Sequence, residues 1–235
     1  MSPANHPPVW AIVPAAGIGQ RMGGERPKQY LEVGERTILE QTLERLATSP
    51  AIRAVLPVIR ADDGHWPAIR ERLGHLPNLL PTAQGGAERS DSVASGLEAL
   101  GEIGDSDRVL VHDAVRPCIR DGDIQAVIGA TTAEQGAILA VPVADTLKRV
   151  AEDGRIQATV DRSELWRAQT PQVFPAGALR RGIEAARSEG RAATDEASLL
   201  EPLGFPVTVV AGREENIKVT KPEDLDWVAR FLEAS

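Results

Sequence analysis

The sequence predicts an α/β fold built on a mainly parallel β-sheet, and two observations support this class. Short runs rich in β-branched residues alternate along the chain with segments whose apolar residues recur at helical spacing. That alternation is typical of βα units, which place helices on both faces of a parallel sheet. The 235 residues, 42% of them hydrophobic, also suffice for one domain with a substantial core. We therefore expect a single domain over residues 1–235 with a Rossmann-like sheet.

The expected strands and helices follow one another in a regular order. Thr37 is the expected N-cap of an amphipathic helix, and the capping box Thr220-Lys221-Pro222-Glu223 is expected to open a last helix that ends at Leu232. Strands are expected at Val9–Val13, Ala54–Ile59, Arg108–Val111, Ala137–Val141 and Val207–Val210. The other helices are expected at Thr37–Thr48, Ser92–Leu100 and Asp121–Ala133.

The segment Val143–Arg162 breaks this rhythm. Asp153-Gly154 stands between two β-prone runs, which is a hairpin signal. We expect a β-arm at about residues 143–162 that projects from the main domain. An ordinary surface hairpin is the open alternative.

Composition and charge limit the classes of function. The net charge of −8 argues against a nucleic-acid binder, although a few local cations can still hold a small anionic substrate. Cys118 is the single cysteine, so no internal disulfide can form and a reducing compartment is favoured. The stretch Met1–Pro8 has no basic start and no long apolar run, so we expect no signal peptide, no membrane span and a cytoplasmic location.

The loop after the first strand carries the first functional signal. It reads Pro14-Ala15-Ala16-Gly17-Ile18-Gly19-Gln20-Arg21-Met22, and Lys28 follows shortly after. Small residues at the carboxyl end of a strand let backbone N–H groups approach phosphate oxygens, and Arg21 and Lys28 would add positive charge. A dinucleotide fingerprint would need glycine at Met22, and a Walker A loop would need Gly-Lys-Ser/Thr in place of Pro27-Lys28-Gln29. The alternative is a tight strand-to-helix connection without a ligand.

This loop resembles the first loop of nucleotidyltransferases, and later motifs narrow the resemblance. In chain order they are Gly85-Gly86-Ala87-Glu88-Arg89-Ser90-Asp91-Ser92-Val93, Val111-His112-Asp113-Ala114-Val115-Arg116-Pro117-Cys118, Asp145-Thr146-Leu147-Lys148, Thr159-Val160-Asp161-Arg162, Gln169-Thr170-Pro171-Gln172, Thr194-Asp195-Glu196-Ala197-Ser198 and Asn216-Ile217-Lys218-Val219-Thr220. Together they cover nearly the whole chain after Pro8. In this order they resemble the 2-C-methyl-D-erythritol 4-phosphate cytidylyltransferase family of the non-mevalonate isoprenoid pathway.

The resemblance implies a role for each set of residues. It implies that Mg²⁺ is the cofactor and that Asp113 is its ligand. The implied CTP-binding residues are Pro14, Ala15, Ala16, Gly17, Gly19, Gly85, Gly86 and Ser92. The implied catalytic residues are Arg21, Lys28, Arg162 and Lys218. The implied acceptor-binding residues are Arg116, Thr146, Arg162, Thr170 and Thr194.

Each of these residues also has a plain structural interpretation. An Asp after a strand, such as Asp113, often caps the next turn, and Arg116 and Lys218 can be solvated surface cations. Arg162 can form a surface ion pair with Asp161, which contributes little to stability. Thr194 can cap a helix. His112 is expected to be structural, because the four histidines lack the spacing of a metal site.

The implied reaction is an in-line attack by the phosphate of 2-C-methyl-D-erythritol 4-phosphate on the α-phosphorus of CTP, with pyrophosphate leaving. The nucleophile is already an anion, so catalysis depends on positioning and electrostatic stabilisation. One alternative is a ribitol 5-phosphate cytidylyltransferase, and an alternative of another class is a non-catalytic nucleotide-binding module. The resemblance also implies a homodimer in which Thr146 and Arg162 of one arm reach the acceptor pocket of the partner.

Overall fold

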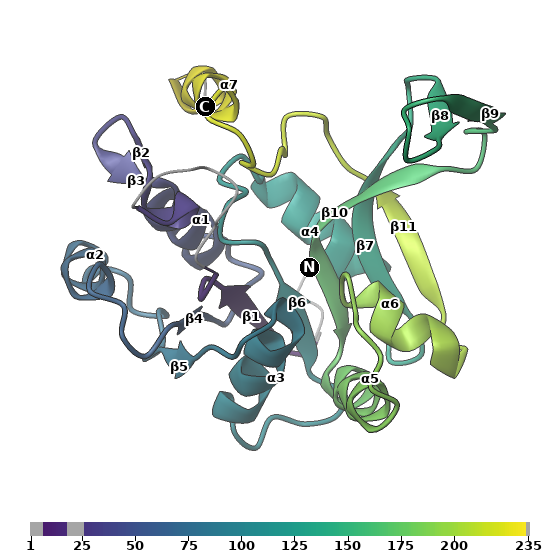
Figure 1. Ribbon diagram of the computed structural model, residues 1–235. Coiled ribbons are helices and arrows are strands. Elements are labelled where there is room, and N and C mark those ends of the chain that lie inside the picture. Colours follow the sequence, from purple (N-terminus) through teal and green to yellow (C-terminus); the bar gives the residue numbers. More distant parts are fainter. Residues whose placement is uncertain (1–6, 18–25, 234–235) are drawn as a thin grey trace.

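A seven-stranded mixed sheet forms the centre of the protein. The structure, a computed structural model, describes residues 7–17 and 26–233 (Figure 1). The strand order is β11-β7-β10-β6-β1-β4-β5, and β10 is the strand that runs antiparallel to both of its neighbours. The strands are β1 (Val9–Pro14), β4 (Ala54–Ile59), β5 (Ala83–Gln84), β6 (Arg108–Val111), β7 (Gly136–Pro142), β10 (Trp166–Pro175) and β11 (Val207–Ala211). The mainly parallel α/β sheet is confirmed.

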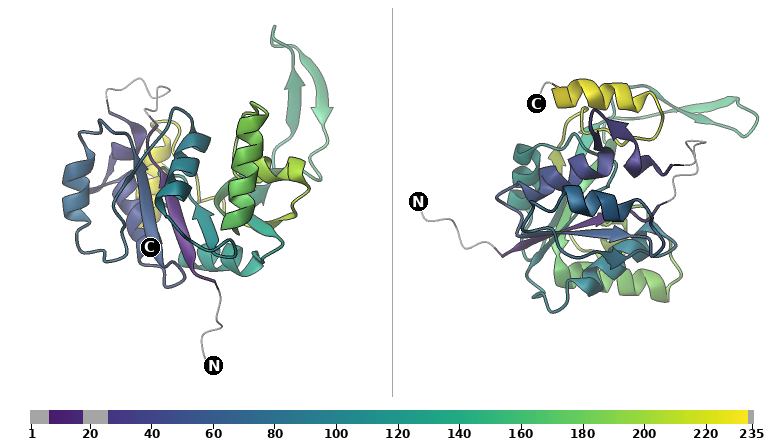
Figure 2. Two further views of the ribbon diagram at one scale, coloured as in Figure 1. Left: turned by 90° about the horizontal axis from the view of Figure 1, so that it is seen from below. Right: turned by 90° about the vertical axis from the view of Figure 1, so that its left-hand side faces the viewer.

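Helices cover both faces of this sheet (Figure 2). One face carries α1 (Ile38–Ala47), α2 (Trp66–Arg72) and α4 (Asp121–Ala130), and the other carries α3 (Arg89–Ala99), α5 (Ala176–Ser188) and α6 (Ala197–Leu200). The last helix, α7 (Asp224–Glu233), packs near the short hairpin of β2 (Glu32–Val33) and β3 (Arg36–Thr37). A 3-10 turn at Lys28–Tyr30 follows the first loop, and a second one spans Glu201–Leu203.

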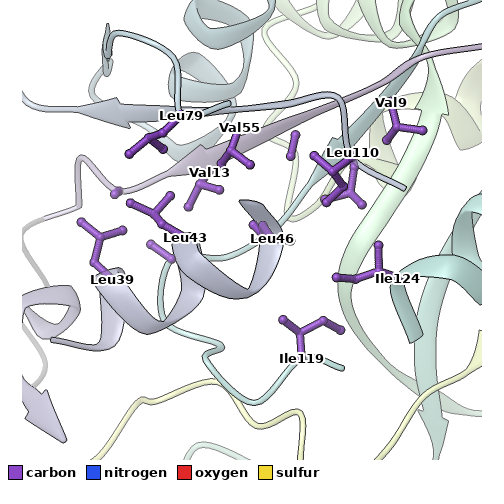
Figure 3. Close-up of a cluster of buried hydrophobic side chains, with 14 of the residues drawn as sticks. Val9, Val13, Leu39, Leu43, Leu46, Val55, Leu79, Leu110, Ile119 and Ile124 are labelled. Atoms are coloured by element: carbon purple, nitrogen blue, oxygen red, sulfur yellow. The ribbon is translucent and has the colours of Figure 1, made fainter. Parts of the chain in front are cut away.

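The strand β1 shows how the sheet separates two cores. Val9, Ala11 and Val13 point to the face of α1, where Leu39, Leu43 and Leu46 meet them (Figure 3). Ile12 points to the opposite face, among residues of α3 and α5. Successive side chains of a strand alternate between faces, so a strand buried on both faces reads as a continuous apolar run. This explains the unbroken run that predicts β1.

The expected arm is present as a separate two-stranded antiparallel sheet. It consists of β8 (Leu147–Val150) and β9 (Ile156–Val160), and it extends away from the body of the molecule (Figure 2). A turn with Gly154 at φ +84° joins the strands, a conformation that glycine adopts without strain. Most residues of both strands are exposed, including the apolar Val150 and Ile156.

Several local predictions hold and others need correction. Thr37 caps α1 as expected and forms a capping box with Glu40. The capping box predicted at the last helix names the wrong acidic residue. The N–H and the hydroxyl of Thr220 donate to Asp224 and not to Glu223, and α7 begins at Asp224. The helix expected at Ser92 begins three residues earlier, at Arg89. Strand β10 and helices α2 and α5 were not expected.

Candidate active site

A pocket opens at the carboxyl ends of β1 and β6, where a parallel sheet binds its ligands. We call it the loop pocket, and its volume is about 220 Å³. A larger hollow of about 350 Å³ lies between α3 and α5, but it lacks the residues of the motifs. The loop pocket is lined by Pro14, Ala15, Ala16, Gly17, Lys28, Gln29, Gly86, Ala87, Glu88, Arg89, Ser92, Asp113, Ala114, Val115, Lys218 and Val219.

Gly85 brings two walls of the loop pocket into contact. A Cβ atom at this position would lie 2.2 Å from the Cβ of Ala16 and 3.1 Å from the Oγ of Ser92. Real Cβ atoms do not approach so closely, so any side chain at Gly85 would push the first loop away from α3. Gly85 therefore shapes the loop pocket without lining it.

Ser92 and Gly86 fix the start of α3 next to the first loop. The N–H of Gly86 donates to the Ser92 Oγ at 3.2 Å, and this hydroxyl donates to the backbone oxygen of Glu88 at 3.2 Å. Glu88 and Asp91 form a capping box at the helix start. The hydroxyl of Ser92 is thus engaged within the chain while its side chain lines the pocket.

The residues after the first loop hold the described part of that loop in place. The Gln29 side chain donates to the backbone oxygens of Ala15 and Gly17, at 2.8 and 3.0 Å. The N–H of Ala15 donates to the backbone oxygen of Val58, so this group cannot also meet a phosphate. Among the described residues of the loop, the expected backbone donors are therefore Ala16 and Gly17. Lys28 Nζ lies 3.3 Å from the backbone oxygen of Thr220 at the edge of the pocket. Gly19 and Arg21 lie outside the described residues.

Asp113 is a buried carboxylate at the centre of a cluster of charges. Its Oδ1 accepts from Arg89 Nε at 3.1 Å, and its Oδ2 lies 3.2 Å from Arg116 Nε and 3.0 Å from Lys218 Nζ. Burial alone would raise the pKa of this carboxyl, but Arg89, Lys218 and Arg116 hold the pKa well below its usual range. Asp113 is therefore an anion at every physiological pH.

Arg116 and His112 help to fix the position of Asp113, Arg116 directly and His112 through Thr170. Arg116 is buried and also donates to the backbone oxygen of Asn216 at 2.7 Å, which fixes the loop that carries Lys218. His112 Nε2 lies 3.0 Å from the backbone oxygen of Arg116, which can only accept, so Nε2 carries the proton. The Thr170 hydroxyl then donates to His112 Nδ1 and accepts from the Asp113 N–H. Burial lowers the pKa of His112 to about 4, so the ring is neutral and structural, as expected.

Sequence reasoning missed an ion pair beside Asp113, between the half-buried Arg89 and the buried Glu196. The Arg89 guanidinium contacts Glu196 through both Nη1 and Nη2, and Glu196 belongs to the motif in which Thr194 is the expected site residue. Both residues belong to motifs that carry the family resemblance, Arg89 to Gly85–Val93 and Glu196 to Thr194–Ser198. A separation of 107 residues hides their contact.

A second hollow of about 200 Å³ adjoins the first, and we call it the strand pocket. It holds three of the expected acceptor-binding residues, Arg116, Thr170 and Thr194. Thr194 is exposed, and its hydroxyl is not the cap of α6, because the Ser198 N–H at the start of that helix donates to Asp195 Oδ1. The strand pocket is lined by Arg89, Asp113, Arg116, Ala168, Gln169, Thr170, Gln172, Thr194, Asp195 and Lys218.

Thr146 and Arg162 lie apart from both pockets. Both are described, both are exposed on or beside the arm, and neither lines the loop pocket or the strand pocket. The single chain therefore does not bring these two expected residues together with Asp113 and Lys218.

The charges around Asp113 do not fit a preformed metal site. Both of its oxygens are engaged by cations, so a divalent cation would have to displace Lys218 or an arginine. Within residues 7–17 and 26–233, no group of three His, Cys, Asp or Glu side chains could hold a metal ion. The assignment of Asp113 as a magnesium ligand stays a prediction.

The fold and this site define the class of the protein. A phosphate-binding type of loop at the carboxyl end of β1, with Lys28 and Lys218 lining one pocket, is typical of an α/β enzyme that binds nucleotides.

Within the described part of the chain, no helix combines the length and the apolar character needed to cross a bilayer.

Comparison with known proteins identifies the family. Residues 9–234 match the family model of 2-C-methyl-D-erythritol 4-phosphate cytidylyltransferase. The chain is 49% identical to the enzyme of that name from Aeromonas hydrophila, over 97% of this chain and 90% of the relative, and 46% identical to that of Ectopseudomonas mendocina, over 93% of each. The crystal structure of a 4-diphosphocytidyl-2C-methyl-D-erythritol synthase matches with a TM-score of 0.82 at 37% identity, covering 96% of this chain and 99% of that one. The crystal structure of the Francisella tularensis 2-C-methyl-D-erythritol 4-phosphate cytidylyltransferase matches with a TM-score of 0.80 at 31% identity, covering 95% of this chain and 99% of that one.

The chain belongs to the 2-C-methyl-D-erythritol 4-phosphate cytidylyltransferase family. It transfers a cytidylyl group from CTP to 2-C-methyl-D-erythritol 4-phosphate and forms 4-diphosphocytidyl-2-C-methyl-D-erythritol in the non-mevalonate pathway. The expected enzyme class is thus confirmed, and neither ribitol 5-phosphate transfer nor a non-catalytic module is supported.

Proposed function

We propose that the loop pocket holds CTP and that the strand pocket holds the acceptor. One observation carries this assignment: the two pockets share Arg89, Asp113 and Lys218 along their common border. A transfer between two bound molecules needs the reacting phosphates to meet at one place. The shared border, with an ammonium group at it, is suited to the α-phosphate of CTP and the phosphate of the acceptor.

In this arrangement the reaction is a single in-line displacement. An oxygen of the acceptor phosphate forms a bond to the α-phosphorus of CTP, and the bond from that phosphorus to the bridging oxygen breaks, which releases pyrophosphate. Lys28 and Lys218 reduce the repulsion between the anions and stabilise the charge of the transition state, as does Arg21 in the first loop. Gly86 and Ser92, positioned by Gly85 behind them, form the wall against which the cytosine base packs. Pro14 to Gly17 form the phosphate wall, and the CTP-binding role of Gly19 stays a prediction from the motif.

Mg²⁺ is proposed to enter as the counterion of CTP, with phosphate oxygens as its main ligands. Mg²⁺ binds few protein carboxylates and keeps water and phosphate ligands. This agrees with the finding that, among the described residues, no group of three His, Cys, Asp or Glu side chains could hold a metal ion. Its charge would offset part of the negative charge of the triphosphate.

We also propose a cytoplasmic location for the protein.

The remaining acceptor residues are proposed to come from a second chain. Thr146 and Arg162 are exposed and stand outside both pockets, while an arm of two strands is only marginally stable without a surface to pack on. In a homodimer with two-fold symmetry, each arm can lie against the partner and bring Arg162 to the partner's strand pocket. A guanidinium there can hold the acceptor phosphate through two parallel hydrogen bonds.

A pyrophosphate-release assay tests the assignment of the two pockets. With CTP and 2-C-methyl-D-erythritol 4-phosphate, we expect Lys218→Ala to reduce kcat by about 10²–10³-fold, because a preorganised charge is lost. The control Lys221→Ala removes the same charge from an exposed position three residues before the start of α7, outside both pockets, and it should leave kcat unchanged. Equal kcat values for both variants would refute the assignment.

Subunit mixing tests the shared site. Lys28→Ala and Arg162→Ala chains are each expected to be nearly inactive as pure dimers. After exchange of equal amounts, half of the dimers are mixed, and each of these has one site with an intact Lys28 and an intact Arg162. The mixture should recover about a quarter of the parental activity. No recovery, with exchange proven by mass spectrometry of the dimers, would refute arm exchange.

A further inference from the structure

We infer that Arg89 and Glu196 are positioning residues for cytidylyl transfer: this ion pair, between a half-buried guanidinium and a buried carboxylate, fixes the Asp113 carboxylate so that Asp113 holds the Lys218 ammonium at the border of the two pockets. The inference rests on the proposed function, because it assigns a supporting pair to the same site. Neither residue follows from the implied roles of the motifs.

Arg89 uses its whole guanidinium in this arrangement. Nη1 and Nη2 bind the two oxygens of Glu196, and Nε binds Asp113 Oδ1 at 3.1 Å. The guanidinium is a rigid plane, so the bidentate contact with Glu196 determines where Nε lies. A lysine would keep the charge but could not bind two carboxylates with one fixed geometry.

Glu196 acts on the site only through Arg89. Its side chain is 1% exposed, and it lines neither the loop pocket nor the strand pocket. The N–H groups of Glu196 and Ala197 both donate to the Gln172 side chain, at 3.0 and 3.1 Å. Gln172 belongs to β10 and pairs with Val111 of β6, so Glu196 is tied to the central sheet.

The second oxygen of Asp113 fixes the position of the Lys218 ammonium group. Lys218 Nζ lies 3.0 Å from Asp113 Oδ2, and the lysine side chain is 43% exposed and lines both pockets. Its ammonium can therefore contact a bound phosphate while the carboxylate holds it. The series of contacts runs from the sheet through Glu196, Arg89 and Asp113 to the border of the pockets.

The charges of the cluster agree with a positioning role. Arg89, Arg116 and Lys218 contribute three positive charges, and Asp113 and Glu196 contribute two negative charges. Glu196 thus compensates Arg89 and leaves one net positive charge, which Lys218 presents to the pockets. Without Glu196, the Arg89 guanidinium would be free to bind a substrate phosphate in competition with Lys218.

Two variants and their matched controls test the inference. Arg89→Lys and Glu196→Gln should each lower kcat by about 10- to 100-fold, while the KM for CTP changes less than about threefold, because the walls of the loop pocket remain. Arg72 and Glu40 form a comparable pair, in which a guanidinium binds both oxygens of a buried carboxylate outside both pockets. Arg72→Lys and Glu40→Gln should leave kcat unchanged even where the melting temperature falls.

A double-variant measurement separates positioning from a general loss of structure. In a Lys218→Ala background, Arg89→Lys should lower kcat less than about threefold further, since the residue through which it acts is already absent. Full additivity of the two losses would overturn the inference, as would parental kcat in Arg89→Lys and Glu196→Gln or a failure of both to fold. If Lys218→Ala reduces kcat and Arg89→Lys does not, the inference fails and the proposed site stands. If Lys218→Ala retains parental kcat, both fail.

Discussion

The charged interior around Asp113 and the exposed β-arm are opposite solutions to the placement of functional residues. Asp113, Arg116 and Arg89 are held by partners within the same chain, at distances near 3 Å. Thr146 and Arg162 stand beside an arm whose strands contact little besides each other. The first group is in position before any ligand or second chain arrives, whereas the second group has no described pocket around it.

The difference follows from the energetics of charge. A carboxylate as deeply buried as Asp113 must be paired within the fold, because an unpaired buried charge is strongly destabilising. An exposed arginine such as Arg162 needs no ion-pair partner within the chain, because water solvates its charge. The loop pocket, proposed to hold CTP, is therefore part of the folding unit, as is the strand pocket, whereas the contribution of Thr146 and Arg162 to the proposed acceptor site depends on assembly.

The largest expected effect is on the interior, through Asp113→Asn. This change leaves three cations with only the Glu196 carboxylate, and breaking a buried ion cluster in this way costs about 3–5 kcal/mol of stability. Thermal unfolding of the variant should show the loss, and added pyrophosphate should restore part of it by taking the place of the carboxylate. The control Asp62→Asn breaks an exposed pair with Arg60 and should cost less than about 1 kcal/mol. Equal stability of Asp113→Asn and the parent would show that the cluster is not needed for folding.

Lys28→Ala should change activity while leaving the fold intact. Loss of one preorganised charge beside the phosphate loop is expected to lower kcat by about 10²–10³-fold, or about 3–4 kcal/mol in the barrier. Pyrophosphate release and the melting temperature are measured on the same samples. A near-normal kcat with an unchanged melting temperature would remove Lys28 from the site and contradict the proposed placement of CTP in the loop pocket.

The buried His112 should make the stability of the interior depend on pH. Its pKa is about 4 in the folded protein, against about 6.5 for an exposed histidine, so the unfolded chain binds the proton more tightly. The stability that His112 contributes is complete above pH 6.5 and is lost as the pH falls towards 4, by about 3 kcal/mol. The difference in unfolding free energy between the parent and His112→Gln should narrow by that amount over this range. His75→Gln, a change at an exposed histidine, should keep the parental profile.

Local chemistry predicted much of the fold, and long-range contacts explain what it missed. The runs at Ala54–Ile59 and Arg108–Val111 match β4 and β6 residue for residue, because both are buried on two faces. Strand β10 was missed because Pro171 and Pro175 argue against a strand, whereas here they lie at an irregularity in the pairing with β7 and at the end of the strand.

The site shows the same division. The motifs predicted Lys28, Asp113 and Lys218, which line one pocket in the structure. They did not reveal that the Asp113 carboxylate is engaged by three cations, because these come from α3, from the loop after β6 and from the loop after β11. A motif records which residues occur together, and only the packed fold shows which of their atoms are already in use.

The smallest expected effect concerns the arm. Successive residues of β9 face opposite sides, so Ile156 and Gln157 present different surfaces although both are exposed in the single chain. If the apolar face of the arm packs on a second chain, burial of Ile156 contributes about 1.5–3 kcal/mol to that contact. Ile156→Lys should then weaken dimerisation at least about tenfold by analytical ultracentrifugation, and Gln157→Lys, with the same added charge on the opposite face, should change it much less. Neither variant should alter the melting temperature of the monomer, since Ile156 is 65% exposed and lies outside the core. An equal and small effect of both variants would mean that the arm lies in solvent, and the proposal that a second chain supplies Thr146 and Arg162 to the acceptor site would have to be abandoned.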